Sequence, residues 1–394
     1  MLAGMCLGTV SGERTWLEQQ FGDQAGYMPL LSGLGRSGEM PLGWSDASGP
    51  ESAVHYAFVQ ENGIGFLRAT GNGSGKLQFM IPLKRQVTKT TAWRIKVKSR
   101  SPERVGLLMG IRQLDRPDEW DRFFASALFD PGVDWSEQEF LMRSGADPKP
   151  AALYLNFGLH GTPATLDIAW IKLEQIDADH YVPPTTRPLI REEGAVAHHH
   201  DEVELARKQQ PSVIFLGDSI TQGWNDAIWD REIAPLNAVN FGIGANTIQH
   251  VLWQVQNMEL GESFTPKVVV LMIGINNYFH VDSDIDIVDG MANLLAEIHK
   301  RSPHSRILLL GLLPQGRQGG TLRREELQTI NRHYASMADG KRVAFLDFGA
   351  KFLDPDGTFP ARFSADATHL TPAGYEVWAK EMLPALTDML KLKQ

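Results

Sequence analysis

The chain has a single cysteine, fewer basic than acidic residues, and no long apolar run. Its single cysteine, Cys6, excludes an intrachain disulfide and a cysteine-based metal site, although this count does not fix the cellular compartment. The formal net charge is -9, and the absence of any lysine- and arginine-rich cluster argues against a nucleic-acid partner. No apolar run approaches the roughly 20 residues of a membrane span. The composition is therefore that of a globular protein with no membrane span.

The length predicts two domains, because 394 residues exceed what one hydrophobic core usually supports. Residues 1–176 contain many short runs that alternate with period two, such as 93–98, between glycine-rich turns. This pattern predicts an all-β antiparallel sandwich. Residues 177–208 contain two consecutive prolines and three consecutive histidines. They are expected to form a solvated linker, because sequential histidines in a polar loop seldom converge on one metal ion.

Residues 209–394 have a different pattern, in which an apolar strand alternates with a helix five times. This predicts an α/β domain with a five-stranded parallel sheet, of the flavodoxin-like doubly wound class, covered by helices on both faces. Sheets of this kind place their chemistry at the carboxyl ends of the strands.

Ser219 follows the first of these strands, where the apolar run 213–216 breaks at Gly217. A buried parallel strand reads as such a continuous run, so Ser219 is expected at the carboxyl edge of the sheet. Taken alone, a serine at this junction is about as often a plain helix N-cap as a nucleophile.

Asp366 and His369 stand three residues apart, just before a helix that Thr371 and Pro372 open. A serine hydroxyl becomes a good nucleophile when a histidine takes its proton, and that histidine needs a carboxylate to fix its tautomer. One tight turn carrying both groups can present them to Ser219.

Asn276 ends another buried run and can donate its amide to a tetrahedral oxyanion. The alternative for this residue is an Asx turn. Residues 240–246 follow a further short strand, and this turn can direct backbone N–H groups toward the same point.

Four sequence blocks, taken in order and spacing, resemble those of the SGNH (GDSL) esterase and lipase superfamily. They are Gly217-Asp218-Ser219, Gly244-Ala245, Gly274-Ile275-Asn276-Asn277 and Asp366-x-x-His369. Residues 240–244, 249–253 and 311–314, together with the Asp366-x-x-His369 block, resemble still more closely the catalytic subunits of intracellular platelet-activating factor acetylhydrolases. The resemblance covers about residues 211–390. In the amino-terminal half, residues 161–174 look like the last strand of galactose-binding-type jelly rolls that serve as carbohydrate-binding modules.

The superfamily resemblance implies a role for each matched residue. Ser219 is the nucleophile, His369 the general base and then acid, and Asp366 the group that orients the histidine. The Ser219 N–H, a backbone N–H of the second block and the Asn276 amide would bind the oxyanion. At the position where the family usually has a glycine in the second block, this chain has Ala245. Gly244 is the alternative donor. The resemblance implies no cofactor.

These features predict a serine esterase that removes short acyl groups, above all O-acetyl, from an acetylated polysaccharide or oligosaccharide. One alternative is an acetylhydrolase of lipid or small esters with a structural sandwich, and another is a glycan-binding protein with a vestigial site. Trp44, Trp120 and Trp135 are candidate sugar platforms, with core packing as the competing role. The mildly apolar residues 1–10 fit a trimmed signal peptide, so we expect a secreted or periplasmic protein. The sequence leaves open whether it forms a homo-oligomer.

Overall fold

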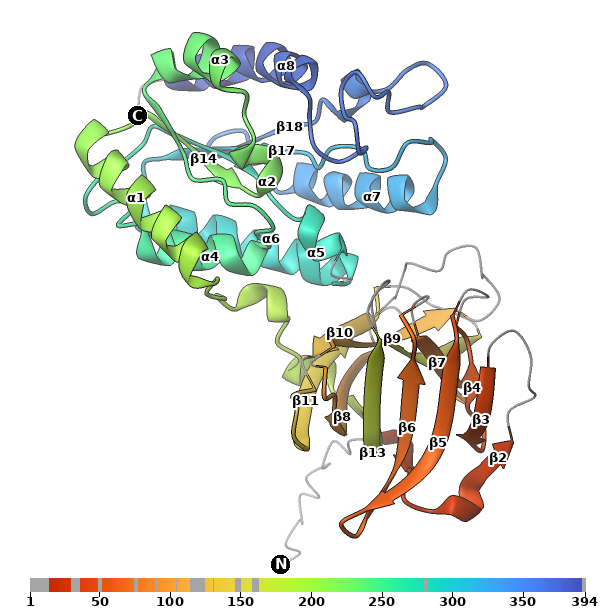
Figure 1. Ribbon diagram of the computed structural model, residues 1–394. Coiled ribbons are helices and arrows are strands. Elements are labelled where there is room, and N and C mark those ends of the chain that lie inside the picture. Colours follow the sequence, from red (N-terminus) through yellow and green to blue (C-terminus); the bar gives the residue numbers. More distant parts are fainter. Residues whose placement is uncertain are drawn as a thin grey trace, which may run out of the picture. The chain divides into compact units, whose positions relative to one another are not determined.

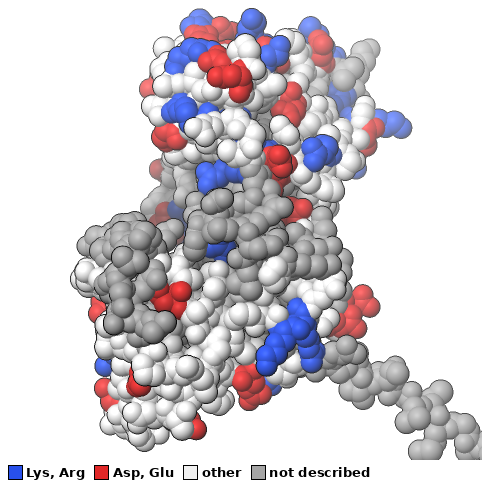
Figure 2. Space-filling view, turned by 90° about the vertical axis from the view of Figure 1, so that its right-hand side faces the viewer, with Lys and Arg blue, Asp and Glu red and all other residues white. Residues whose placement is uncertain are grey.

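The chain divides into two compact units, Met1–Val182 and Pro183–Gln394, in a computed structural model (Figure 1). Acidic and basic side chains are interspersed on the face shown in Figure 2. Within the described ranges, no helix is both long and apolar enough to cross a membrane. The structure describes residues 14–29, 36–48, 52–73, 77–88, 91–103, 105–113, 125–129, 131–145, 150–157, 163–279 and 282–391.

The first unit consists of two β-sheets (Figure 1). The larger sheet has the order β11-β8-β13-β6-β5-β3-β2, and β1 also pairs with β13; β3 and β5 are parallel, and the other pairs are antiparallel. The smaller sheet, β10-β9-β12-β7-β4, is antiparallel throughout. The strands are β1 Arg14–Gln20, β2 Tyr27–Pro29, β3 Arg36–Pro41, β4 Ser45–Asp46, β5 Val54–Glu61, β6 Ile64–Gly71, β7 Leu77–Pro82, β8 Ala92–Arg100, β9 Leu107–Gln113, β10 Ala125–Phe129, β11 Ser136–Arg143, β12 Ala151–Phe157 and β13 Ala164–Ile176, with short helices η1 Gln24–Gly26 and η3 Ala178–His180.

The two sheets pack face to face around one apolar core. Along β8 the buried residues Trp93, Ile95 and Val97 alternate with partly exposed basic residues, which is the period-two pattern that the sequence shows. These buried side chains share a core with Met109 of β9 and Leu153 of β12, strands of the other sheet. The first unit is therefore the all-β sandwich that the alternation predicts.

The candidate sugar platforms of this unit differ from one another. Trp44 is 7% exposed and packs against Phe21 and Phe79, so it belongs to the core and offers no face to a ligand. Trp135 is half-buried, and the guanidinium of Arg100 lies 4.8 Å from the centroid of its ring. Trp120 lies outside the described residues.

The second unit is built on a five-stranded, wholly parallel sheet of order β15-β14-β16-β17-β18. Numbered from the first strand of this unit, the order is 2-1-3-4-5, that of flavodoxin-like doubly wound sheets. The strands are β14 Val213–Gly217, β15 Ala238–Asn240, β16 Val268–Met272, β17 Arg306–Leu310 and β18 Val343–Leu346. The five parallel strands that the sequence predicts are thus present.

Helices cover both faces of this sheet. α3 and α8 lie on one face, and α4, α6 and α7 lie on the other (Figure 1). The strands β14 and β16 are buried at every residue, as expected for a sheet covered on both sides. The helices are η4 Pro184–Thr186, α1 Glu193–Gln209, α2 Ser219–Gln222, α3 Asp226–Ile228, the π-helix η5 Trp229–Ile233, η6 Ala234–Leu236, α4 Ile248–Asn257, α5 Ile275–Phe279, α6 Asp284–Arg301, α7 Leu322–Ser336, η7 Gly349–Phe352 and α8 Pro372–Lys391.

The segment expected to be a solvated linker, residues 177–208, differs from that expectation. From Pro183 onward it belongs to the second unit, and its second half is part of the helix α1. Val203 and Ala206 of α1 join the core of this unit, and His199 is fully buried against Trp253. The buried positions recur at helical spacing, but one of them is a histidine and many charged residues lie between them, which hides that period in the sequence. The described residues contain no group of three or more His, Cys, Asp or Glu that could hold a metal ion.

The burial of His199 predicts a loss of stability in acid. Burial lowers the pKa of His199 to about 4, against the opposing effect of the Asn257 backbone. In the unfolded chain, His199 is protonated below about pH 6.5. In the folded chain, it stays neutral until the pH falls to about 4. The contribution of neutral His199 to stability is therefore complete at neutral pH and falls as the pH drops through this window. We expect this residue to account for about 2 kcal/mol of lost unfolding free energy between about pH 7.5 and about pH 5.

Urea unfolding of the wild type and of His199→Leu at both pH values measures this contribution. The variant should lose about 2 kcal/mol less than the wild type on acidification. His200→Leu is the matched control, because the neighbouring His200 is exposed. An identical pH dependence in wild type and His199→Leu would contradict the prediction.

Candidate active site

Ser219 is the first residue of α2, directly after the buried strand β14. The N-cap of α2 is Asp218, whose Oδ1 accepts the Ile220 N–H at 2.9 Å. The capping role that a serine often has at such a junction is thus filled by its neighbour, and the Ser219 hydroxyl remains available. Gly217 allows this tight junction, because a Cβ there would lie 2.6 Å from the Met272 carbonyl oxygen.

Ser219, His369 and Asp366 form one hydrogen-bonded chain, although 150 residues separate the serine from the histidine. The Ser219 Oγ lies 2.9 Å from His369 Nε2, and His369 Nδ1 lies 2.7 Å from Asp366 Oδ2. The other carboxylate oxygen of Asp366 accepts the backbone N–H groups of Thr368 at 2.9 Å and His369 at 2.7 Å. Asp366 therefore holds both the ring and the backbone of His369. The turn closes through Ala367, which has a φ of +61°.

Electrostatics keep Asp366 ionised. Partial burial would raise the pKa of this carboxyl, but the hydrogen bonds from the His369 ring and from the His369 and Thr368 N–H groups hold it well below its usual range. The side chains of Asp366 and His369 are 55% and 54% exposed, so the site is open to solvent. An ionised carboxylate beside Nδ1 favours the tautomer in which Nε2 can take a proton from Ser219.

Asp218 behaves in the opposite way. It is 1% exposed, and burial raises its pKa to about 7 despite the hydrogen bond from the Ile220 N–H. The folded protein thus keeps a proton on Asp218 that the unfolded chain releases above about pH 4. The contribution of Asp218 to stability falls as the pH rises toward about 7, with a sign opposite to that of His199.

The turn after β15 lies beside the serine, since a Cβ placed on Gly244 would be 3.9 Å from the Cβ of Ser219. Gly244 N–H donates to Gln222 Oε1 at 2.8 Å, so this candidate donor is occupied. The N–H groups of Ala245 and Ser219 donate to no group of the described residues. Of the two alternatives in this block, Ala245 therefore has the available N–H.

Asn276 lies at the start of α5, after the end of β16, and its Nδ2 donates to the Asn246 carbonyl oxygen at 2.8 Å. An amide nitrogen carries two hydrogens, so one such bond leaves the second for another acceptor. The adjacent Asn277 is fully buried, and its Oδ1 accepts the Ile248 N–H at the start of α4. Asn276 thus ties its own strand end to the turn beside Ser219, while Asn277 anchors α4.

Ala245 has a φ of +59°, a region that costs a residue with a Cβ roughly 1 kcal/mol relative to glycine. We expect Ala245→Gly to raise the unfolding free energy by about 1 kcal/mol and to leave kcat within about threefold. Ala292→Gly, at an exposed position inside α6, should instead lower stability by about 0.5–1 kcal/mol. Urea unfolding compares the two variants, and a similar loss in both would contradict the strain assigned to Ala245.

The loop that carries Asp366 is held by a residue outside the four sequence blocks. The guanidinium of Arg317 donates to the carbonyl oxygens of Phe359 at 2.6 Å, Ser364 at 2.9 Å and Ala365 at 2.7 Å. These bonds fix the backbone immediately before Asp366. No spacing pattern could reveal this contact, because a long side chain makes it across more than 40 residues of sequence.

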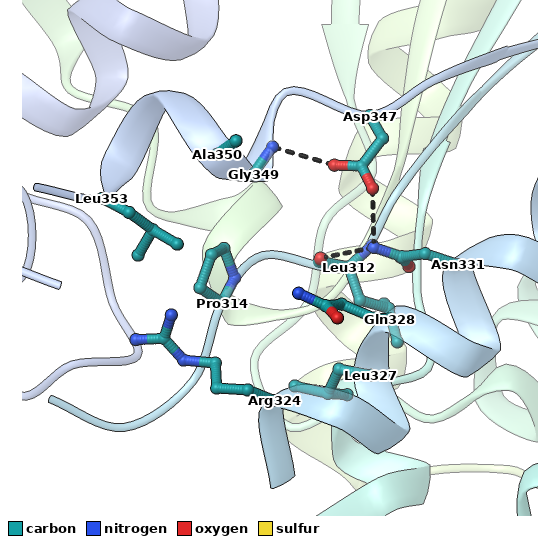
Figure 3. Close-up of a pocket in the computed structure, with 10 residues that line it drawn as sticks. All are labelled: Leu312, Pro314, Arg324, Leu327, Gln328, Asn331, Asp347, Gly349, Ala350 and Leu353. Carbon is teal, nitrogen blue, oxygen red and sulfur yellow. Dashed lines mark hydrogen bonds between the residues drawn. The ribbon is translucent and has the colours of Figure 1, made fainter. Parts of the chain in front are cut away.

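A cleft of about 340 Å³ lies at the carboxyl ends of β17 and β18, against α7 (Figure 3). Asp347 accepts hydrogen bonds there from Gly349 N–H and Asn331 Nδ2. None of the site residues predicted from the sequence lines this cleft. Its lining consists of Leu312, Pro314, Arg324, Leu327, Gln328, Asn331, Asp347, Gly349, Ala350 and Leu353.

One wall of this cleft connects to the loop that carries Asp366 and His369. Arg324 is 6% exposed and donates to the carbonyl oxygens of Gln315 and Gly316, each at 2.7 Å. Gln315 Oε1 in turn accepts the hydroxyl of Thr368 at 2.8 Å, next to His369. The cleft and the Ser219 site therefore share a supporting loop.

Comparisons with known proteins find similarity to ester-hydrolysing enzymes. Residues 215–377 match the model of the GDSL-like Lipase/Acylhydrolase family. The chain is 36% identical over 197 residues to platelet-activating factor acetylhydrolase IB subunit alpha1 of Homo sapiens, which covers 50% of this chain and 84% of that protein. It is 31% identical over 211 residues to subunit alpha2 of Rattus norvegicus, covering 53% of this chain and 91% of that protein.

Similar solved structures include a family two carbohydrate esterase from Cellvibrio japonicus. The two chains are 12% identical with a TM-score of 0.34, and the match covers 88% of this chain and 97% of that one.

Proposed function

The chain belongs to the GDSL-like lipase/acylhydrolase family and hydrolyses esters, and from this premise we propose that it is a serine esterase that removes O-acetyl groups from a carbohydrate. The observation that carries the proposal is the hydrogen-bonded chain from Ser219 through His369 to Asp366. This arrangement supplies a nucleophile, a proton acceptor and a group that orients the acceptor.

The first half of the reaction forms an acyl-enzyme. Ser219 Oγ attacks the ester carbonyl while its proton passes to His369 Nε2, and the carbonyl oxygen becomes an oxyanion. The N–H groups of Ser219 and Ala245 and the second Nδ2 hydrogen of Asn276 would donate to that oxyanion. Breaking of the C–O bond then releases the alcohol, which takes the proton from His369.

The second half returns the enzyme to its starting state. A water molecule gives a proton to His369 Nε2 and attacks the acyl carbonyl, and the same donors bind the second oxyanion. Release of acetate restores the Ser219 hydroxyl as His369 gives the proton back. Every proton is accounted for by this chain and water, so the proposed cycle needs no cofactor.

Two observations support an acetyl group on a large substrate. The relatives that share about a third of their residues with this chain are named acetylhydrolases, which favours acetyl as the acyl group. Asp366 and His369 are more than half exposed, so an ester on a polymer can reach Ser219 without entering a closed pocket. The β-sandwich would then be a carbohydrate-binding module, with Trp135 as a candidate platform, and the protein would act outside the cytoplasm as a secreted or periplasmic enzyme.

A second candidate is an acetylhydrolase of lipid or small esters, in which the sandwich is only structural. The name of the relatives favours it, because both are subunits of a platelet-activating factor acetylhydrolase.

Acetate release from acetylated polysaccharides, acetylated monosaccharides and a short-acyl phospholipid distinguishes the two candidates. Ser219-dependent release from a polysaccharide would support the carbohydrate esterase. Release from the phospholipid or small esters alone would overturn the carbohydrate assignment and favour the second candidate.

A further inference from the structure

Arg191 lies two residues before α1, in the segment that the sequence presents as a linker. Its side chain is 18% exposed, and no sequence block of the family includes it. The Leu189 N–H donates to the Gln249 carbonyl oxygen at 3.1 Å, which anchors this segment on α4, the helix that follows the turn beside Ser219. Arg191 therefore approaches the site from a fixed backbone.

The guanidinium of Arg191 is held in one orientation. Its Nε and Nη2 donate to the two carboxylate oxygens of Glu192 at 2.7 and 2.8 Å. Its Nη1 donates to the Gly244 carbonyl oxygen at 2.8 Å and contacts Asn246 Oδ1 at 3.4 Å. Such a planar fork, fixed on one side by a carboxylate, directs its remaining donor with little freedom.

The Gly244 carbonyl and the Ala245 N–H belong to the same peptide group. A trans peptide is planar, and its C=O and N–H bonds point in opposite directions. Arg191 fixes the direction of the carbonyl and so fixes that of the N–H as well. A cation at the carbonyl oxygen also polarises the peptide and strengthens the N–H as a donor.

The other polar groups of this turn already have partners. Gly244 N–H donates to Gln222, the Asn246 carbonyl accepts from Asn276, and Asn246 Nδ2 donates to Gln254 Oε1 at 2.7 Å. The Ala245 N–H donates to no other group of the described chain. The turn thus presents one free donor, on the peptide that Arg191 holds.

We propose that Arg191 is a positioning residue for the oxyanion hole, which orients and polarises the Gly244–Ala245 peptide so that the Ala245 N–H binds the oxyanion. This inference rests on the proposed esterase function of Ser219. It also identifies Ala245, rather than Gly244, as the donor from the second block.

The test compares Arg191→Met with Arg187→Met, which replaces an exposed arginine of the same segment. With an aryl acetate as substrate, Arg191→Met should lower kcat about 10- to 100-fold and change KM less than about threefold. This loss in kcat is no larger than the loss expected when a whole oxyanion-hole donor is removed. Arg187→Met should match the wild type. Arg191→Lys, which keeps one charged donor but not the fork, should recover part of the loss.

A trifluoromethyl ketone separates positioning from general support of the fold. It forms a tetrahedral oxyanion on Ser219, so its inhibition constant should rise in Arg191→Met by the same factor by which kcat/KM falls. A purely structural role would lower the melting temperature without this proportional weakening, and that result would overturn the inference. If Arg191→Met does not fold, the same proportionality is required of Arg191→Lys.

The proposed function and this inference fail in different ways. If the wild type shows no turnover that Ser219→Ala abolishes, the esterase site itself is wrong. If the wild type turns over through Ser219 but Arg191→Met and Arg187→Met have the same kcat, only the role of Arg191 is wrong.

Discussion

Ser219→Ala is expected to lower kcat for an aryl acetate by about 10⁴- to 10⁶-fold. In the proposed mechanism the Ser219 Oγ attacks the ester, and no other described serine shares its hydrogen bond to His369. The oxyanion donors and the substrate contacts remain in the variant, so a small residual rate above that of water should persist. The measurement is the initial rate of phenol release from purified proteins, with the fold verified by circular dichroism.

Ser336→Ala is the matched control for Ser219→Ala. Ser336 is at the end of α7, and its hydroxyl donates only to the His333 carbonyl oxygen of the same helix. This variant should keep the full rate. A Ser219→Ala protein that retains more than about a hundredth of the wild-type rate would contradict the assignment of Ser219 as nucleophile.

Asp366→Asn should lower kcat by about 10²- to 10⁴-fold and leave KM nearly unchanged. An asparagine amide facing His369 Nδ1 favours the tautomer that carries its proton on Nε2, and this nitrogen can no longer accept one from Ser219. The side chain of Asp366 is 55% exposed, so water can replace part of its effect, and the lower part of that range remains compatible with the mechanism.

The pH profile adds a second readout. Hydrogen bonds hold the pKa of Asp366 well below its usual range, so the carboxylate remains ionised and should add no titration step to the wild-type profile above about pH 4. Asp388→Asn, on the exposed surface of α8, serves as control and should match the wild type in both rate and profile. Full activity in Asp366→Asn would exclude Asp366 as the group that orients His369.

The sequence predicts the second unit well because its signals are local. Each of the five strands is a short apolar run followed by a helical period, and parallel strands with helical crossovers leave few alternative topologies. Ser219 and the Asp366–His369 pair follow from the same logic, since each lies at the end of an element whose position the topology determines. The structure places these three residues within hydrogen-bonding distance.

Contacts made by long side chains across the fold could not be predicted. Arg191 reaches Gly244 across 53 residues, and Gln222 reaches the same residue across 22. The contact with Gln222 occupies the Gly244 N–H and so favours Ala245 as the proposed donor, a choice that the sequence leaves open. The helix α1 escaped prediction for another reason, because its buried face includes His199, which a pattern search counts as polar.

Covalent labelling with a fluorophosphonate tests the central claim most directly, because it reports on the nucleophile without depending on the natural substrate. The account predicts one label per chain, located on Ser219 by peptide mass spectrometry, with esterase activity lost in proportion to labelling and no label in Ser219→Ala. An unlabelled wild type would indicate a vestigial site in a glycan-binding protein. Full activity in a fully labelled protein would contradict the role of Ser219.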